Sequence, residues 1–226
     1  MKENVTRRNF LATAGVAALA ATSTSALAAE SGGGKTLKIL GISCSPRKGM
    51  TTAKAVQAAL DAAKGVDARI EVELIDLGGL SIAGYSPKPP QDDFTAILPK
   101  LQDPALGGLL IGSPSYFRGL SSLCKAFIER CAPLREPKMV LANKPVGVVA
   151  VGAFRNGGQE MTIEQIQAAM LCFGMIPVGG NAPAFQGATV LSTKDDISAD
   201  ELGLDTAKKL GAHVGEMALR LAPKEA

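Results

Sequence analysis

The sequence contains no tryptophan and a single histidine among its 226 residues, and its four cysteines are widely spaced. The cysteines at positions 44, 124, 131 and 172 include no CxxC pair, the spacing typical of zinc sites and iron–sulfur clusters. The HExxH and GxSxG patterns of metalloproteases and serine hydrolases are also missing. We therefore expect neither a metal site nor catalytic acid–base residues, so a bound cofactor would have to perform any chemistry.

No apolar run is long enough to span a membrane, but the first 28 residues have the pattern of an export signal. Residues 6–11 (TRRNFL) carry a twin-arginine pattern, a weakly apolar stretch follows over 10–21, and the small residues at 26–28 (ALA) offer a cleavage point. The alternative is an amphipathic N-terminus without a targeting role. We predict a twin-arginine signal peptide over 1–28 and a periplasmic mature protein, exported already folded.

Neither sign of charge is in excess, since the net charge is +3 and falls near zero once the signal is removed. This balance argues against nucleic acid or a membrane surface as a partner. Residues 29–36, with three consecutive glycines, are typical of a flexible linker. The remaining residues, 37–226, are long enough for one domain with a sizeable core.

Apolar runs that suit buried strands alternate with helical patterns along this domain. The predicted strands are 37–43, 69–77, one that opens at 109–112, 145–152 and 175–178. The predicted helices are 51–64, 94–101, 121–131, 159–173 and 199–221. This alternation predicts an α/β fold, a doubly wound sheet of five parallel strands with helices on both faces. Such sheets bind ligands outside the carboxyl ends of their strands, which directs attention to loops 43–52, 113–120 and 152–160.

Loop 43–52 (SCSPRKGMTT) suits a single phosphate. It leads into a helix, whose first amides and dipole attract an anion, and its hydroxyls and Arg47 add donors. It lacks the glycine spacing of nucleoside-triphosphate and dinucleotide loops. Two other interpretations stay open: an ordinary helix cap rich in serine and threonine, or a reactive thiol at Cys44, because a helix N-terminus lowers a thiol pKa.

The other two loops suit a planar ring and a close backbone approach, respectively. Loop 113–120 (SPSYFRGL) contains an aromatic pair that is costly to expose, although two aromatics could equally cap the core. Loop 152–160 (GAFRNGGQE) contains paired glycines that allow close backbone approach to a ligand, or simply form a turn. A phosphate site, a ring site and bare backbone at one edge match the parts of flavin mononucleotide (FMN).

The segments SPRKGMTT, GSPSYFRGLSSLCKAFIER and RNGGQEMTIEQIQAAMLCFGMIPVG resemble the flavodoxin-like NADPH-dependent FMN reductase family, and within it the iron–sulfur flavoprotein branch. The resemblance covers residues 37–180 and implies a flavodoxin-like fold with bound FMN, commonly in homodimers or homotetramers. It assigns the FMN phosphate to Ser43, Ser45, Arg47, Thr51 and Thr52. It assigns the flavin ring to Pro114, Ser115, Tyr116, Phe117 and Gly119, and further contacts to Gly152, Arg155, Asn156, Gly157 and Gly158.

The chain departs from this family pattern at three places. Residues 79–94 contain no cysteine where the branch carries a compact cysteine cluster, so we expect no iron–sulfur cluster. Thr51 stands where the family usually has asparagine, and Arg118 stands where a glycine is usual beside the flavin. A cation beside the flavin favours its reduced, anionic form.

Together these features predict an exported FMN-dependent oxidoreductase that transfers electrons or hydride to a small acceptor such as a quinone. Two alternatives belong to other classes: a non-enzymatic electron carrier in the manner of flavodoxin, and a flavin-binding module without redox function. Nicotinamide nucleotides are cytoplasmic, so we expect a redox partner protein, rather than NAD(P)H, as the electron donor.

Overall fold

The structure is a computed structural model that describes residues 35–182 and 185–223. The predicted signal peptide and most of the predicted linker lie outside the described residues. The strands are β1 (Leu37–Ser43), β2 (Ile70–Asp76), β3 (Leu106–Pro114), β4 (Pro145–Gly152), β5 (Ile176–Pro177) and β6 (Ala188–Leu191). The helices are α2 (Thr51–Lys64), α3 (Phe94–Leu101), α4 (Ser122–Arg130), the short η2 (Ala132–Leu134), α5 (Gln159–Leu171) and α6 (Glu201–Leu221).

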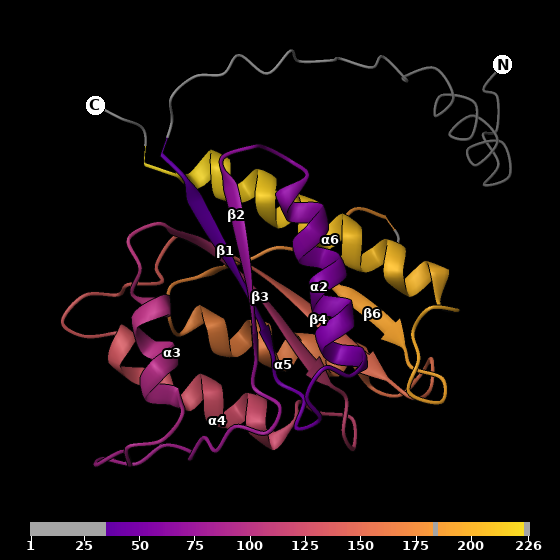
Figure 1. Ribbon diagram of the computed structural model, residues 1–226, viewed down its shortest axis with the longest axis horizontal. Helices are drawn as coiled ribbons and strands as arrows, with labels where there is room; N and C mark the ends of the chain where they lie inside the picture. Colours follow the sequence, from indigo (N-terminus) through magenta and orange to yellow (C-terminus); the bar gives the residue numbers. More distant parts are fainter. Residues whose placement is uncertain (1–34, 183–184, 224–226) are drawn as a thin grey trace, which may run out of the picture. The chain divides into compact units, whose positions relative to one another are not determined.

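The strands form one parallel sheet in the order β2-β1-β3-β4-β5, with β6 also paired to β4 (Figure 1). β1 lies between β2 and β3. The connection from β1 leads to β2 on one side, and the next connection crosses back from β2 to β3 on the other side of β1. A sheet wound in this order has its ligand crevice at that switch point, outside the carboxyl ends of the strands. The predicted flavodoxin-like α/β fold is confirmed.

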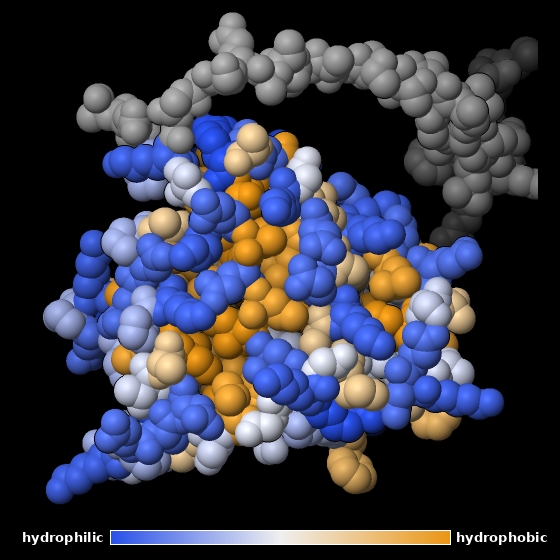
Figure 2. All heavy atoms as spheres, viewed as in Figure 1, coloured by the Kyte–Doolittle hydropathy of each residue, from blue (hydrophilic) through white to orange (hydrophobic). Residues whose placement is uncertain are grey.

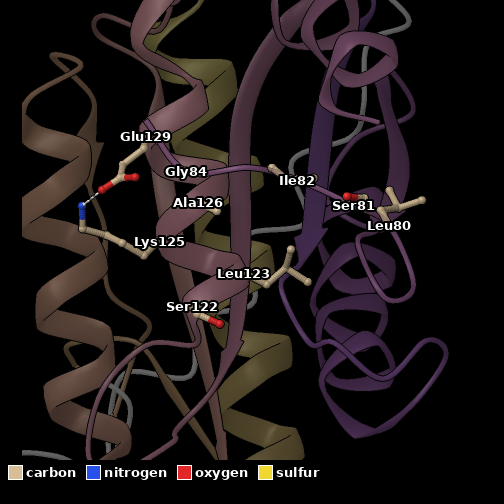
Figure 3. A pocket seen from close by; sticks show the side chains of 9 residues that line it. All are labelled: Leu80, Ser81, Ile82, Gly84, Ser122, Leu123, Lys125, Ala126 and Glu129. Atoms are coloured by element: carbon tan, nitrogen blue, oxygen red, sulfur yellow. Dashed lines mark hydrogen bonds and ion pairs between the residues drawn. The ribbon is translucent and has the colours of Figure 1, made fainter. Parts of the chain in front are cut away.

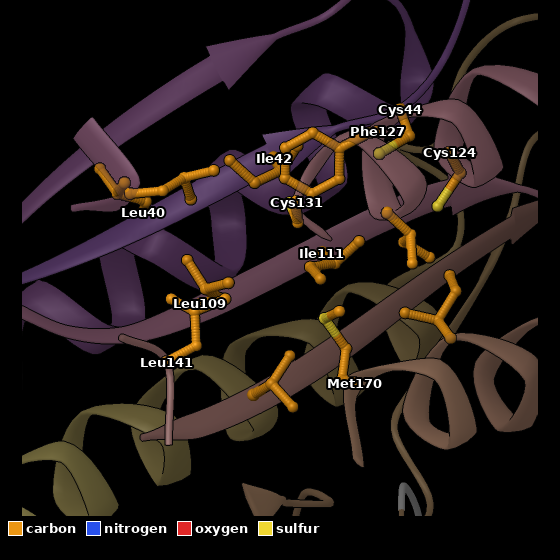
Figure 4. Packing of buried hydrophobic residues seen from close by; sticks show 14 of the residues in the cluster. Leu40, Ile42, Cys44, Leu109, Ile111, Cys124, Phe127, Cys131, Leu141 and Met170 are labelled. Carbon is orange, nitrogen blue, oxygen red and sulfur yellow. The ribbon is translucent and has the colours of Figure 1, made fainter. Parts of the chain in front are cut away.

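Two apolar cores cover the two faces of the sheet. One packs α3, α4 and α5 against the sheet and includes Leu40, Phe127 and Met170 (Figure 4). The other packs α2 and α6 against the opposite face and includes Val56 and Val214. Strand β4 is buried along its whole length, as expected for a parallel strand covered on both faces.

The edge beyond β4 differs from the prediction. β5 contains only Ile176–Pro177 and pairs with the start of β4, while β6 pairs with the end of β4. Two short strands therefore share the fifth position, and the sheet is six-stranded rather than five-stranded. β6 spans only four residues, too few for a clear alternation pattern, and the sequence analysis assigned no strand there. This strand brings the turn at 193–196 to the carboxyl edge of the sheet.

The segment between β2 and α3 is attached to α4 by a buried ion pair. Arg130 and Asp92 form this pair, and each side chain is only 8% exposed. The Arg130 guanidinium also lies 5.1 Å from the centre of the Phe94 ring. Burial raises the pKa of Asp92, but hydrogen bonds from the Ala83 amide and from Arg130 outweigh it and lower the pKa below its usual value. These contacts fix the segment in which the iron–sulfur flavoprotein branch carries a cysteine cluster that this chain lacks.

Hydrophobic residues are exposed along the middle of the face shown in Figure 2, over β2 and beside α2. Val72 and Leu74 of β2, and Leu80 just beyond it, are only partly buried. β2 is the edge strand at this side of the sheet, which explains why its side chains are less covered. Within the described ranges, no helix combines the length and the apolar character needed to cross a membrane.

Candidate cofactor site

The three loops identified in the sequence follow β1, β3 and β4 and lie at the same edge of the sheet, as predicted. Hydrogen bonds join them. Ser121 Oγ donates to the Cys44 carbonyl oxygen at 2.7 Å, and the Ser121 amide donates to Ser113 Oγ at 3.0 Å. Ser115 Oγ donates to the Gly157 carbonyl oxygen at 2.9 Å. The three loops therefore form one connected surface.

The loop after β1 has the features of an anion cradle. Thr51 and Thr52 open α2 and are buried, as is Ser45. Met50, the N-cap residue, contributes no side-chain hydrogen bond, so the first amides of α2 are left without a side-chain cap. Ser43 Oγ is buried and has no hydrogen-bond partner among the residues that the structure describes. Uncapped helix amides, with an unpartnered hydroxyl at the end of β1, fit a phosphate.

Asp76, at the end of β2, holds this loop in place. Its carboxylate accepts hydrogen bonds from the Gly49 amide at 2.6 Å and from the Gly78 amide at 3.1 Å. Gly78 packs so closely on the loop that a Cβ there would lie 2.4 Å from Lys48 Cα. The backbone of the cradle is therefore fixed by the protein's own contacts.

Arg47 reaches across the edge to a residue far away in the sequence. Its Nη1 donates to Asp195 Oδ1 at 2.7 Å, and the two side chains are 49% and 53% exposed. The hydrogen bond from Arg47 to Asp195 raises the pKa of Arg47, and the nearby Tyr116 hydroxyl contributes less. The structure thus pairs Arg47, which is predicted to bind the phosphate, with a carboxylate.

The loop after β3 forms a tight turn over residues 116–119. Tyr116 and Gly119 exchange two backbone hydrogen bonds, of 2.9 and 3.0 Å. Phe117 and Arg118 at its tip have φ angles of 50° and 64°, in the left-handed region that favours glycine. Phe117 is fully exposed and Tyr116 is 42% exposed, so the two aromatic rings do not cap the core. The remaining residues predicted for the ring site are Pro114, which ends β3, and Ser115, which begins the loop.

The loop after β4 approaches the turn at 116–119 backbone to backbone. Gly158 has a φ of 92°, and a Cβ there would lie 2.6 Å from Arg118 Cα. Arg155 forms an ion pair with Asp200 at the start of α6. Gln159 Oε1 is buried and has no hydrogen-bond partner in the described part of the chain. Of the other residues predicted here, Gly152 is buried, Gly157 is partly buried and Asn156 is exposed.

A hollow of about 480 Å³ opens where these two loops meet the start of α5. Its lining residues are Arg118, Arg155, Asn156, Gly158, Gln159, Glu160, Met161 and Thr189. Nη2 of Arg118 contacts the Met161 sulfur at 3.6 Å. A cation and the positive end of a helix dipole thus stand beside the predicted ring site, where they favour negative charge.

Cys44 does not have the environment of a reactive thiol. Its side chain is wholly buried and points into the core beside Cys124 (Figure 4). Burial, together with the neighbouring Cys124 thiol, raises the pKa of Cys44 well above its usual range. Because a nucleophilic cysteine needs a low pKa and access to its substrate, the structure argues against that alternative.

A second hollow, of about 530 Å³, lies between α4 and the segment after β2 (Figure 3). Leu80, Ile82 and Leu123 supply apolar wall, and the Lys125–Glu129 ion pair stands at one side. The residues that line it include no cysteine and no histidine. Among the described residues, no group of three histidine, cysteine or acidic side chains is placed to hold a metal ion.

Asp76 and Asp195 were not predicted from the sequence as residues of this site. Asp76 closes an alternating strand pattern (RIEVELIDL), so the rule that ligands bind at carboxyl ends of strands could have identified it. Asp195 follows β6, a strand that the sequence analysis did not assign. The short run ATVL at 188–191, with two β-branched residues, was the only local signal for this strand.

A parallel sheet in this order, with an anion cradle at its switch point and exposed loops beside it, defines a flavodoxin-like mononucleotide-binding protein. The family comparison is more specific. The model of the NADPH-dependent FMN reductase family matches residues 37–190, and the chain belongs to this family.

Two relatives and one solved structure are similar to this chain, and the structure is similar in fold. An iron–sulfur flavoprotein of Methanocaldococcus jannaschii is 40% identical over 192 residues, which cover 80% of this chain and 97% of that protein. An NAD(P)H dehydrogenase (quinone) of Geotalea uraniireducens is 28% identical over 129 residues, covering 50% and 63%. The solved structure of RosB with bound 8-demethyl-8-formylriboflavin-5′-phosphate matches with a TM-score of 0.67 at 15% identity, covering 82% and 80%.

The protein is therefore an FMN-dependent oxidoreductase, and FMN is its cofactor. The residues at the carboxyl edge fit this cofactor. The uncapped start of α2 and the unpartnered Ser43 Oγ suit its phosphate, and the hollow lined by the loop after β4 and Arg118 lies beside the predicted ring site. Which side chains contact the flavin stays a prediction.

Proposed function

We propose that the protein works as an exported oxidoreductase that takes electrons from a redox partner protein and passes them to a small acceptor such as a quinone. The observation that carries the proposal is the joining of three loops at one edge of the sheet. One has the features of a phosphate cradle, one presents the partly exposed Tyr116, and one packs its backbone at Gly158 against the turn at 116–119. The proposal goes beyond the family in its compartment, donor and acceptor.

When bound, FMN supplies the redox chemistry by accepting and releasing electrons at its ring. The residues of the chain bind and orient it. The amides at the start of α2, with the Thr51 and Thr52 hydroxyls, would hold the phosphate. The Ser115–Gly157 hydrogen bond keeps the two ring loops at a fixed separation. Arg118, beside the ring site, favours the negative charge that the flavin gains on reduction.

Two observations support the compartment and the acceptor. The twin-arginine pattern at residues 6–11 supports export, and an exported enzyme has no supply of nicotinamide nucleotides, which favours a protein donor. Similarity to a protein named NAD(P)H dehydrogenase (quinone) supports a quinone as the acceptor.

One observation favours the second candidate, a non-enzymatic electron carrier. Phe117 is fully exposed and Phe154 is 77% exposed, and both belong to the loops at the cofactor edge. Exposed aromatic residues are enriched where proteins dock on one another. The same residues would suit a homodimer or homotetramer.

Cell fractionation tests the export. We expect the flavoprotein in the periplasmic fraction; recovery of the full-length chain only from the cytoplasm would contradict export.

A reoxidation experiment separates the oxidoreductase from the electron carrier. The purified protein is reduced anaerobically and mixed with a soluble quinone in a stopped-flow spectrometer. The oxidoreductase is expected to reoxidise in one rapid phase with about one quinol formed per flavin. A carrier would leave the quinone essentially unreduced and would be reoxidised only by a redox protein.

A further inference from the structure

The turn after β6 presents a carboxylate to Arg47, one of the residues predicted to bind the phosphate. Thr193 and Asp196 close this turn through two backbone hydrogen bonds, of 2.8 and 3.0 Å. Lys194 and Asp195 at its tip have φ angles of 52° and 61°. A two-residue turn with both central residues in the left-handed region is compact, so it holds the Asp195 side chain near the edge of the sheet.

Asp195 contacts the cradle through Arg47, although 148 positions separate the two residues. The 2.7 Å bond between them is charge-assisted, the kind of bond that a phosphate oxygen also accepts from a guanidinium. Both side chains are about half exposed, so solvent screens the pair and it exchanges partners readily. Arg47, which is predicted to bind the phosphate, is thus already paired with another anion.

We propose that Asp195 takes the place of the FMN phosphate on Arg47, so that the cofactor binds by displacing this carboxylate. The inference rests on the proposed phosphate site in the loop after β1. When FMN binds, Arg47 exchanges one anionic partner for another and Asp195 is released to solvent. Asp195 therefore lowers the affinity for FMN. It leaves the affinity for riboflavin unchanged, because riboflavin has no phosphate and does not compete for Arg47.

The variant Asp195→Asn tests this exchange. Asparagine keeps the shape of the side chain and tolerates the left-handed backbone, but it carries no charge. Flavin is removed from the protein, and the affinities for FMN and riboflavin are measured by fluorescence titration at low ionic strength. FMN is expected to bind roughly two- to fivefold more tightly to the variant, with riboflavin unchanged. The gain should shrink as salt is added.

Asp67→Asn is the matched control. Asp67 pairs with Arg69 at 2.8 Å just before β2, at the opposite edge of the sheet, and its substitution changes the net charge equally. Its affinity for FMN should equal that of the wild type.

Several results would overturn the inference. Weaker FMN binding by Asp195→Asn would mean that the carboxylate orients Arg47 toward the phosphate instead of competing with it. Unchanged FMN affinity, an equal gain for riboflavin, or an equal gain in Asp67→Asn would also count against it. A wild-type chain that binds no FMN in the same titration would contradict the proposed function as well, and this baseline separates the two failures.

Discussion

Replacing Arg47 with alanine is expected to weaken FMN binding by about one to two decades. A hydrogen bond to a charged group contributes roughly 1.5–3 kcal/mol, and each 1.4 kcal/mol changes an affinity tenfold. Arg47 gives up a half-exposed ion pair worth at most about 1 kcal/mol when it turns to the phosphate, so the lower part of that range is expected. Fluorescence titration of the flavin-free protein with FMN measures the loss.

The comparison with riboflavin shows whether the loss occurs at the phosphate. Riboflavin should bind to Arg47→Ala almost as well as to the wild type. Lys48→Ala is the matched control, since Lys48 is an adjacent exposed cation, and its effect on FMN should be much smaller. Cys44→Ser should keep the FMN affinity. Normal FMN binding by Arg47→Ala, together with loss of activity in Cys44→Ser, would make the loop a thiol site and our assignment wrong.

The substitution Arg130→Met is expected to lower the free energy of unfolding by about 3–5 kcal/mol. It leaves the Asp92 carboxylate buried without its charged partner, and it removes the cation from the face of the Phe94 ring. The double variant Arg130→Met with Asp92→Leu should be more stable than Arg130→Met alone, because no unpaired charge stays buried. Urea denaturation followed by circular dichroism measures both.

The pH dependence of the free energy of unfolding provides a second test of the Arg130–Asp92 ion pair. The pKa of Asp92 is lower in the folded protein than in the unfolded chain, where it is about 3.9. The contribution of Asp92 to the free energy of unfolding is therefore complete above the unfolded pKa and is lost as the pH falls through the folded-state pKa. The stability of Arg130→Met should therefore fall less in acid than that of the wild type. Lys125→Met, which removes an exposed ion pair from the same helix, should cost at most about 0.5 kcal/mol. A loss equally small in Arg130→Met would contradict the role of the buried pair.

The sequence predicted the elements whose patterns are long and local. β4 is a continuous apolar run, and α2 repeats apolar residues at helical spacing, so both were predicted with the bounds that the structure has. β6 was missed because four residues give no period, and because the edge position is divided between two strands by residues 178–187. Pairing with β4, a long-range interaction, decides that β6 is a strand.

The candidate site was predictable where it depends on the ends of strands. Parallel strands place the loops after β1, β3 and β4 at one edge whatever their detailed conformation, and Ser43, Thr51 and Thr52 lie where the pattern placed them. Local sequence could not provide the partners of long side chains. The pairing of Arg47 with Asp195 depends on the position of a strand that was not assigned, far along the chain.

The pattern of the loop also could not predict the orientation of the Cys44 side chain. Alternation along β1, continued one residue past its end, places this side chain on the same face as Ile42, inside the core.

The central claim, that this edge of the sheet holds one FMN, is tested most directly by identifying the flavin that the protein selects. The purified chain is saturated with an equal mixture of FMN and FAD, unbound flavin is removed, and the bound flavin is released by heat and identified by chromatography. We predict about one FMN per chain and little FAD, because the cradle has no second glycine-rich turn for a pyrophosphate. Recovery of FAD, or of no flavin at all, would contradict the account.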